Sequence, residues 1–207
     1  MSAVSILCGM YTGGPVACNA YLLQGAGGYV LVDAPAGVLP WLRKQLPAGA
    51  TLTHLLLTHQ HFDHVQGAAE VQRETGCRIH AVYPFSKGLT LEDMAPWIDP
   101  VEHYSVDSFG SAPRTADWGG IKWRVFPIAG HALDGVAYYA EESGELFVGD
   151  ILFAGSVGRT DFPKGSSATL VEGIRKHLLP LPAETVVYSG HGPATTIGQE
   201  AAGNPYL

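Results

Sequence analysis

The sequence predicts an α/β fold in which short β-strands alternate with a few helices. The 207 residues include 26 Gly and 14 Pro, which indicates many turns and a sheet-rich fold rather than a helical bundle. Short apolar runs recur along the chain, and some are separated by segments of helical character. Each half of the chain also places strands before a helix. A chain of this length predicts one domain, over residues 1–207.

In the first half, the apolar runs predict a hairpin and then a strand–helix–strand unit. The hairpin turn is the Gly-rich segment 24–28, and Gly76 ends the helix of the unit. Strands that flank a helix in this way predict a crossover connection. The predicted elements are strands at 20–23, 29–32, 54–57 and 77–82 and helices at 38–46 and 67–75.

The second half begins with a segment that lacks periodicity. Residues 83–118 collect four prolines and predict an irregular rim, with one helical turn near 91–94. Regular structure then resumes, and the clearest late helix has an apolar face formed by leucine and isoleucine. The predicted elements are strands at 121–126, 136–140, 145–148 and, as the last strand, 185–188, with a helix at 167–179.

The segment 59–64 contains four metal-competent side chains directly after an apolar run. Imidazole and carboxylate are the ligands that a borderline-soft divalent metal prefers when no thiolate is offered. In an extended turn alternate positions point the same way, so His59 and His61 can bind one ion. Asp63 and His64 then reach toward a second ion. Crowded imidazoles repel when protonated, which makes a solvated polar loop a poor explanation for this segment.

Three later metal-competent residues follow apolar strands in the same manner. His131, Asp150 and His191 each come after an apolar run and a short turn that contains Gly. Sites in α/β folds are assembled at strand ends along one sheet edge, because rigid strands hold the loops. Four such strand ends in one chain predict a metal site at one edge of the sheets.

The charge balance argues against a nucleic-acid partner. The 12 Lys and Arg residues are outnumbered by 19 Asp and Glu, which leaves a net charge of −7 and no basic run. The three cysteines are odd in number and lack CxxC spacing, so we expect a reducing compartment. The sequence lacks a signal-peptide pattern and an apolar stretch of the roughly 18 residues that a membrane span needs. It therefore predicts a cytoplasmic protein without membrane contact.

Taken together, these residues resemble the metallo-β-lactamase superfamily. Its hallmark is Thr-His-x-His-x-Asp-His, which residues 58–64 match. The later Gly-His, Gly-Asp and Gly-His elements match at His131, Asp150 and His191, in the expected order. The resemblance implies a sandwich of two mixed β-sheets between helices (αββα), with a metal site at one sheet edge.

The resemblance also implies two divalent metal ions, with zinc expected first and iron or manganese as alternatives. A carboxylate would bridge the ions, because it offers one oxygen to each. The implied ligands are His59, His61 and His131 for the first ion, Asp63, His64 and His191 for the second, and Asp150 for both.

Within the superfamily, residues 149–163 resemble the hydroxyacylglutathione hydrolase (glyoxalase II)-like branch. This resemblance implies a small-molecule acyl thioester as substrate and a metal-bridging hydroxide as nucleophile. Asp63 would orient that nucleophile and can shuttle its proton. The chain stops at Leu207 without the helical extension that helps longer relatives bind glutathione. We therefore expect an open pocket and weak dependence on glutathione.

Several alternatives stay open. An iron-dependent persulfide dioxygenase shares the Gly-Arg-Thr-Asp loop at 158–161, and a lactonase needs the same hydroxide. Arg159, the one guanidinium in that loop, can bind a substrate carboxylate or form a salt bridge with Asp161. Asp134 can orient His131 as a hydrogen-bond acceptor or serve as a turn residue.

Overall fold

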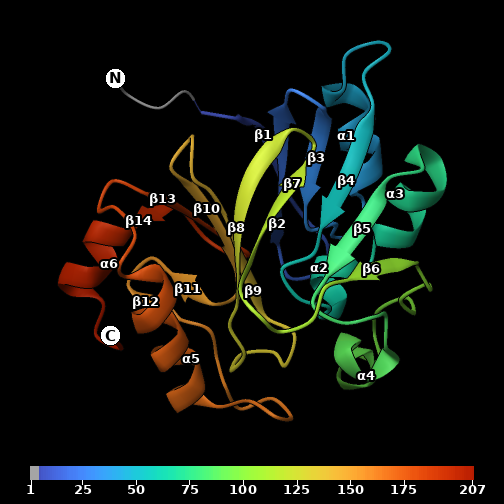
Figure 1. The fold of residues 1–207 in the computed structure, drawn as a ribbon. Coiled ribbons are helices and arrows are strands. Elements are labelled where there is room, and N and C mark those ends of the chain that lie inside the picture. Colours follow the sequence, from blue (N-terminus) through green and yellow to red (C-terminus); the bar gives the residue numbers. More distant parts are fainter. Residues whose placement is uncertain (1–4) are drawn as a thin grey trace.

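Two β-sheets face each other in the computed structural model, which describes residues 5–207, and helices cover their outer faces (Figure 1). Helices α1 (Val38–Gln45) and α3 (Ala68–Thr75) lie against the first sheet, and α5 (Ser167–Gly173) lies against the second. This arrangement confirms the predicted αββα sandwich. Gly76 ends α3 in the left-handed conformation (φ 69°), as predicted.

The first sheet contains six strands in sequential order, from β1 to β6. Its first three strands are antiparallel, and the pairs from β3 to β6 are parallel, so the sheet is mixed. Parallel pairing requires crossovers, and the helices α1 and α3 provide two of them. The strands are β1 (Leu7–Gly13), β2 (Cys18–Gly25), β3 (Gly28–Val32), β4 (Leu52–Leu56), β5 (Arg78–Ala81) and β6 (Val106–Ser108).

The second sheet has the order β14-β13-β10-β9-β8-β7. Only β10 and β13 pair in parallel, because the chain passes through α5 between them. The remaining pairs are antiparallel. The strands are β7 (Arg114–Trp118), β8 (Ile121–Pro127), β9 (Val136–Ala140), β10 (Glu145–Gly149), β13 (Val186–Ser189) and β14 (Thr195–Thr196).

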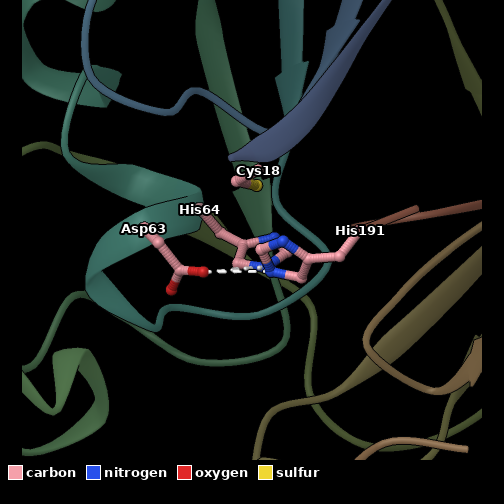
Figure 2. A group of neighbouring side chains, drawn as sticks. All are labelled: Cys18, Asp63, His64 and His191. Atoms are coloured by element: carbon pink, nitrogen blue, oxygen red, sulfur yellow. Dashed lines mark hydrogen bonds and ion pairs between the residues drawn. The ribbon is translucent and has the colours of Figure 1, made fainter. Parts of the chain in front are cut away.

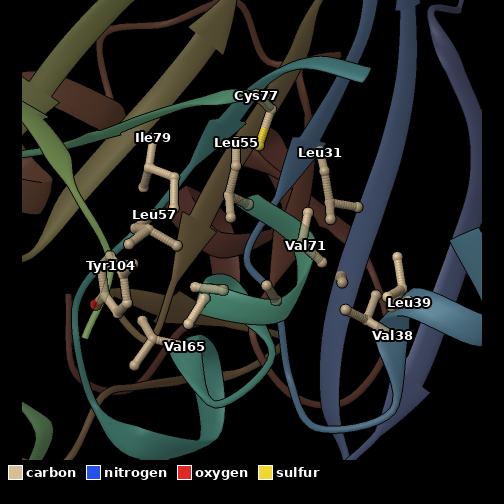
Figure 3. Close-up of a cluster of buried hydrophobic side chains, with 14 of the residues drawn as sticks. Leu31, Val38, Leu39, Leu55, Leu57, Val65, Val71, Cys77, Ile79 and Tyr104 are labelled. Atoms are coloured by element: carbon tan, nitrogen blue, oxygen red, sulfur yellow. The ribbon is translucent and has the colours of Figure 1, made fainter. Parts of the chain in front are cut away.

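Three layers of buried apolar side chains hold these elements together. Figure 3 shows the outer layer between the first sheet and its helices, where Leu31 and Leu55 pack against Val38 and Val71. The middle layer lies between the two sheets and is rich in aromatic rings, which bury large areas of apolar surface. The third layer packs α5 and the π-helical turn Ile174–Leu178 onto the second sheet. The predicted helix at 167–179 is therefore confirmed, with a wider final turn.

The segment 83–118 contains more regular structure than its sequence predicts. The helical turn near 91–94 is present as Glu92–Met94, after the short helix α4 (Lys87–Thr90). However, the segment also contributes β6 and β7, which the prediction of an irregular rim missed. Both strands lie at sheet edges and are mostly exposed. Main-chain hydrogen bonds to one neighbouring strand hold each of them in its sheet, and most of their side chains face solvent. The alternation of apolar and polar residues that predicts a strand is therefore weak in both.

Other short elements were also missed, and one prediction was wrong. Residues 185–188 do form a strand, but it is not the last, because β14 pairs antiparallel with it and α6 (Ile197–Gly203) follows. The missed elements also include β1, the helix α2 (Phe62–Val65), and the hairpin of β11 (Leu152–Phe153) and β12 (Ser156–Val157). Among the described residues, the helices are all too short or too polar to cross a bilayer.

Candidate metal centre

Four strand ends converge at one edge of the sandwich, as the sequence predicts. The loops after β4, β8, β10 and β13 supply the seven predicted residues, and main-chain hydrogen bonds tie these loops together. The Val136 amide donates to the Thr58 carbonyl at 2.8 Å, and the Gly190 amide donates to the Gly149 carbonyl at 2.8 Å. The residues brought together are His59, His61, Asp63, His64, His131, Asp150 and His191.

The first cluster consists of three imidazoles, those of His59, His61 and His131. His61 Nδ1 lies 3.0 Å from His59 Nε2 and 3.1 Å from His131 Nε2. Burial lowers the pKa of all three imidazoles, and it acts with the neighbouring His131 to lower the pKa of His61 to about 3. The rings are therefore neutral near pH 7, and each can offer a nitrogen lone pair to a cation.

The second cluster combines Asp63 with His64 and His191, as Figure 2 shows. His191 Nε2 lies 3.2 Å from Asp63 Oδ2, and His64 Nε2 lies 3.6 Å from the same oxygen. Burial alone would raise the pKa of Asp63, but the two facing imidazoles lower it below its usual range. The same attraction, opposed by burial, raises the pKa of His191. Asp63 therefore stays ionised and gives this cluster a carboxylate, which the first cluster lacks.

Asp150 lies between the two clusters. Its Oδ2 is 3.5 Å from His131 Nε2 in the first cluster and 3.7 Å from His191 Nε2 in the second. Its Oδ1 is 3.4 Å from His64 Nε2. Burial opposes ionisation, but His64 and His131 lower the pKa of Asp150 overall. An ionised carboxylate at this point can contact a cation in either cluster.

The buried polar atoms of the centre fit a bound cation. His64 Nε2 and Asp150 Oδ1 are both buried and have no hydrogen-bond partner. Leaving such atoms without a partner costs about 1–3 kcal/mol each, and more for a charged group. His64 Nδ1 donates to Asp33, so Nε2 is the nitrogen that faces the cluster. Burial lowers the pKa of His64, but the nearby carboxylates raise it overall, so without a metal Nε2 carries a proton, which a bound cation would replace. A divalent metal accepts lone pairs from both atoms, and so supplies the missing partner.

The groups that orient the histidines of the centre differ from those that the sequence suggests. Asp134 does not orient His131, because His131 Nδ1 donates instead to the Arg159 carbonyl at 2.8 Å. The residue that the sequence analysis missed is Asp33, at the end of β3. Its carboxylate accepts from His64 Nδ1 at 2.8 Å and from the amide and hydroxyl of Thr58 at 2.8 and 2.7 Å. An acidic residue directly after a buried strand was the available signal.

Cys18 was also missed, because its sequence spacing is not that of a thiolate site. Its sulfur lies with the donor atoms of Asp63, His64 and His191 in one group, all within 4.8 Å of one another (Figure 2). Burial raises the pKa of the thiol to about 12, so the cysteine is protonated near pH 7. The thiol donates to the Asn19 carbonyl at 3.5 Å.

Gly190 shows how tightly the centre is packed. A β-carbon at this position would overlap the Asp150 carboxylate and the His64 ring. Position 190, after β13, therefore requires glycine because the backbone passes close to these two side chains, and not only because a turn follows.

A cleft of about 640 Å³ opens onto the centre. Arg159 lines this cleft, but its guanidinium already bonds Asp161, through Nε at 2.6 Å and through Nη2 at 2.5 Å. It also lies over the Phe162 ring, 4.4 Å from the centroid. The ion pair with Asp161 that the sequence left open is thus present, and a substrate carboxylate would have to replace that partner.

The sequence matches known proteins along nearly its whole length. A relative from Haemophilus influenzae, hydroxyacylglutathione hydrolase GloC, is 35% identical over 158 residues, which cover 74% of each chain. The crystal structure of BLEG-1 B3 metallo-beta-lactamase superposes with a TM-score of 0.87 at 31% identity, over 96% of this chain and 98% of that one. The crystal structure of TTHA1623 in a di-iron-bound form superposes with a TM-score of 0.83 at 34% identity, over 96% of this chain and 100% of that one. Residues 13–191 match the family Lactamase_B. The chain therefore belongs to the metallo-beta-lactamase superfamily and is a metal-dependent hydrolase of that fold.

Proposed function

We propose that this protein hydrolyses acyl thioesters at a centre of two divalent metal ions. The observation that carries the proposal is the position of Asp150, with carboxylate oxygens between two separate ligand clusters. A relative named as a hydroxyacylglutathione hydrolase and a similar structure in a di-iron-bound form support the substrate class and the metal count. Zinc is the metal that we expect first.

Each of the seven residues then has a defined task. When bound, two cations would supply a water acidic enough to ionise near neutral pH and positive charge for the carbonyl oxygen. The neutral imidazoles hold the first position, and Asp63, His64 and His191 hold the second. Asp63 lines the cleft and its pKa is lowered, so its carboxylate stays ionised. We assign it the orientation of the attacking water and the transfer of its proton.

Arg159 has a conditional role in this proposal. Its permanently charged fork lines the cleft, and it can bind a carboxylate on the substrate once Asp161 has moved away. The exchange replaces one carboxylate by another, so the number of charge-assisted hydrogen bonds is preserved.

The second candidate function is an iron-dependent persulfide dioxygenase, and the similarity to the crystal structure of ETHE1 from Myxococcus xanthus, with a TM-score of 0.78 at 25% identity, supports it. A single iron needs one set of ligands, whereas this chain has a second cluster whose buried His64 nitrogen lacks a hydrogen-bond partner. A one-metal enzyme would keep a proton on that nitrogen, between the Asp63 and Asp150 carboxylates, so the number of bound metal ions distinguishes the two functions.

The decisive experiment is a substrate panel with protein loaded with zinc, iron or manganese. We expect thioester hydrolysis without oxygen consumption, and slower turnover of lactones and β-lactams. Asp63→Asn should lower kcat by at least about 100-fold, within the range for a general base, whereas Asp117→Asn, on the exposed strand β7 and outside the cleft, serves as the control. Oxygen-dependent turnover of a persulfide by protein with one iron, or no thioester hydrolysis with any metal, would contradict the proposal.

A further inference from the structure

Exposed apolar side chains are concentrated at the mouth of the cleft. Among residues 5–207, six large apolar side chains are strongly exposed, and three of them line this cleft. They are Val16, Met94 and Trp97, with 43%, 58% and 62% of their surface exposed. Scattered single apolar residues are normal on a protein surface, but a group of them around a concave site marks a binding surface.

One wall of the cleft joins these residues to the metal centre. The Phe62 ring meets the Trp97 indole edge to face, with centroids 5.9 Å apart, and Met94 lines the same cleft. Phe62 begins helix α2 and lies in sequence between His61 and Asp63. The wall therefore starts beside the centre and runs outward to the rim.

The segment that carries Met94 and Trp97 is held in place by polar contacts. Lys87 Nζ donates to Glu92 Oε1 at 2.6 Å and to the Val101 carbonyl at 2.7 Å. The Val101 amide donates to Glu92 Oε2 at 2.9 Å, and Gln66 Nε2 donates to the Asp99 carbonyl at 2.9 Å. A fixed segment that presents apolar side chains to solvent can bind a ligand without first ordering itself, which lowers the entropic cost of binding.

We propose that the wall of Phe62, Met94 and Trp97 binds an apolar, uncharged acyl chain attached to the reacting carbonyl. This inference rests on the proposed thioesterase function and specifies its substrate class. The wall offers neither charge nor hydrogen-bond donors except the indole NH, so it selects acyl chains by apolar burial. A methylene contributes about 0.8 kcal/mol on burial, which corresponds to roughly fourfold in kcat/KM per methylene until the cleft is filled.

The test is a series of thioesters of one thiol, from acetyl to decanoyl, with the metal-loaded protein. We expect kcat/KM to rise with chain length in the wild type. In Met94→Ala and Trp97→Ala, the slope of log kcat/KM against chain length should fall by at least about half, because buried apolar area is lost. Met10→Ala and Tyr206→Ala are matched controls, since both side chains are exposed, at 53% and 57%, and lie outside the cleft. They should keep the wild-type slope.

A binding measurement separates this inference from the proposed function. Straight-chain carboxylates, the products of such hydrolysis, are titrated into the metal-loaded protein by calorimetry. Affinity should increase with chain length and lose that dependence in Trp97→Ala but not in Tyr206→Ala. If no thioester is hydrolysed and this pattern persists, the proposed reaction fails and the apolar site stands. A flat chain-length dependence in both measurements, or equal effects in the control variants, would overturn the inference.

Discussion

At the residue scale, hydrogen bonds to one ring nitrogen of a histidine decide which of its nitrogens faces the centre. His64 presents Nε2 to the second cluster because Nδ1 is held by Asp33, and His131 presents Nε2 because Nδ1 is held by the Arg159 carbonyl. Groups that orient ligating histidines in this way also raise their basicity. The residues of the two clusters could be predicted from sequence, whereas the contact between Asp33 and His64 could not, because it joins residues 31 positions apart.

Asp150→Asn tests the bridging role. The substitution keeps the side-chain volume but removes the charge that would offset two cations. We expect metal to be lost, from the second position above all, and hydrolytic activity to fall by at least about 100-fold, the upper range for disturbed metal sites. Metal per chain by mass spectrometry and kcat on one thioester are the measurements. Near-normal turnover with two metals per chain would show that Asp150 does not bridge.

Asp33→Ala tests the positioning of His64. The change leaves His64 Nδ1 and the buried Thr58 hydroxyl without their acceptor. We expect affinity for the second metal to fall about 10- to 100-fold, as for other groups that orient ligating histidines. Competition with a chromogenic chelator measures this loss, and Asp33→Asn, which retains one acceptor oxygen, should recover part of it. Equal metal affinity in the wild type and both variants would show that Asp33 does not position His64.

At the scale of secondary structure elements, strands with at least one buried face could be predicted from their apolar residues. Short strands that are held only by main-chain pairing with a neighbouring strand could not. The strands β3 and β4 are apolar and buried, and their positions follow from the sequence. By contrast, β6 and β14 are three and two residues long and are specified by main-chain partners that the sequence does not display. The crossover from β4 through α3 to β5 was predicted from the order of elements and is present.

The strand β5 carries a histidine whose titration should affect stability. His80 is buried, stacks on Trp118 at 4.4 Å, and has an Nε2 without a hydrogen-bond partner. Burial and then the neighbouring His54 lower the pKa of His80 to about 4, below the roughly 6.5 of an unfolded chain. The unfolded state therefore binds the proton more readily. This contribution to stability is complete above about pH 6.5 and is lost progressively as the pH falls toward 4.

His80→Phe should remove that pH dependence while keeping an aromatic ring against Trp118. Urea unfolding at several pH values between 7 and 4.5, with a chelator present, measures the free energy of unfolding. We expect it to fall less steeply with acid in His80→Phe than in the wild type. The exposed His103 provides the control substitution His103→Gln, which should keep the wild-type slope. If the free energy of unfolding fell equally steeply with acid in all three proteins, the pH dependence would not arise from His80.

At the scale of the whole molecule, the sandwich brings residues 59 and 191 into one centre. The order of the motifs and the family resemblance were sufficient to predict the architecture and which seven residues lie together at its edge. The cleft could not be predicted, because its walls combine the β1–β2 turn, α2, the 91–97 segment and the loop after β12. The Arg159–Asp161 pair likewise depends on loop geometry that the sequence leaves open.

Metal removal should destabilise the fold as a whole. Ligands from four strand ends belong to one centre, so a cation that binds the folded state selectively adds to its stability. At a free metal concentration of 100 times the dissociation constant, this contribution is about 2.7 kcal/mol. We expect a lower Tm after chelation and recovery on adding zinc. A Tm that does not change with metal would indicate that the ligands are not held together by the ion.

The central claim is that two metal ions occupy the two clusters and share Asp150. Anomalous diffraction from crystals of the zinc-loaded protein tests it directly, because each bound ion gives its own peak. We predict two peaks per chain about 3.5–4 Å apart, the usual spacing in two-metal sites. One should lie against His59, His61 and His131, the other against Asp63, His64 and His191, with Asp150 contacting both. A single peak at full metal loading, with His64 and His191 turned away from it, would contradict the claim.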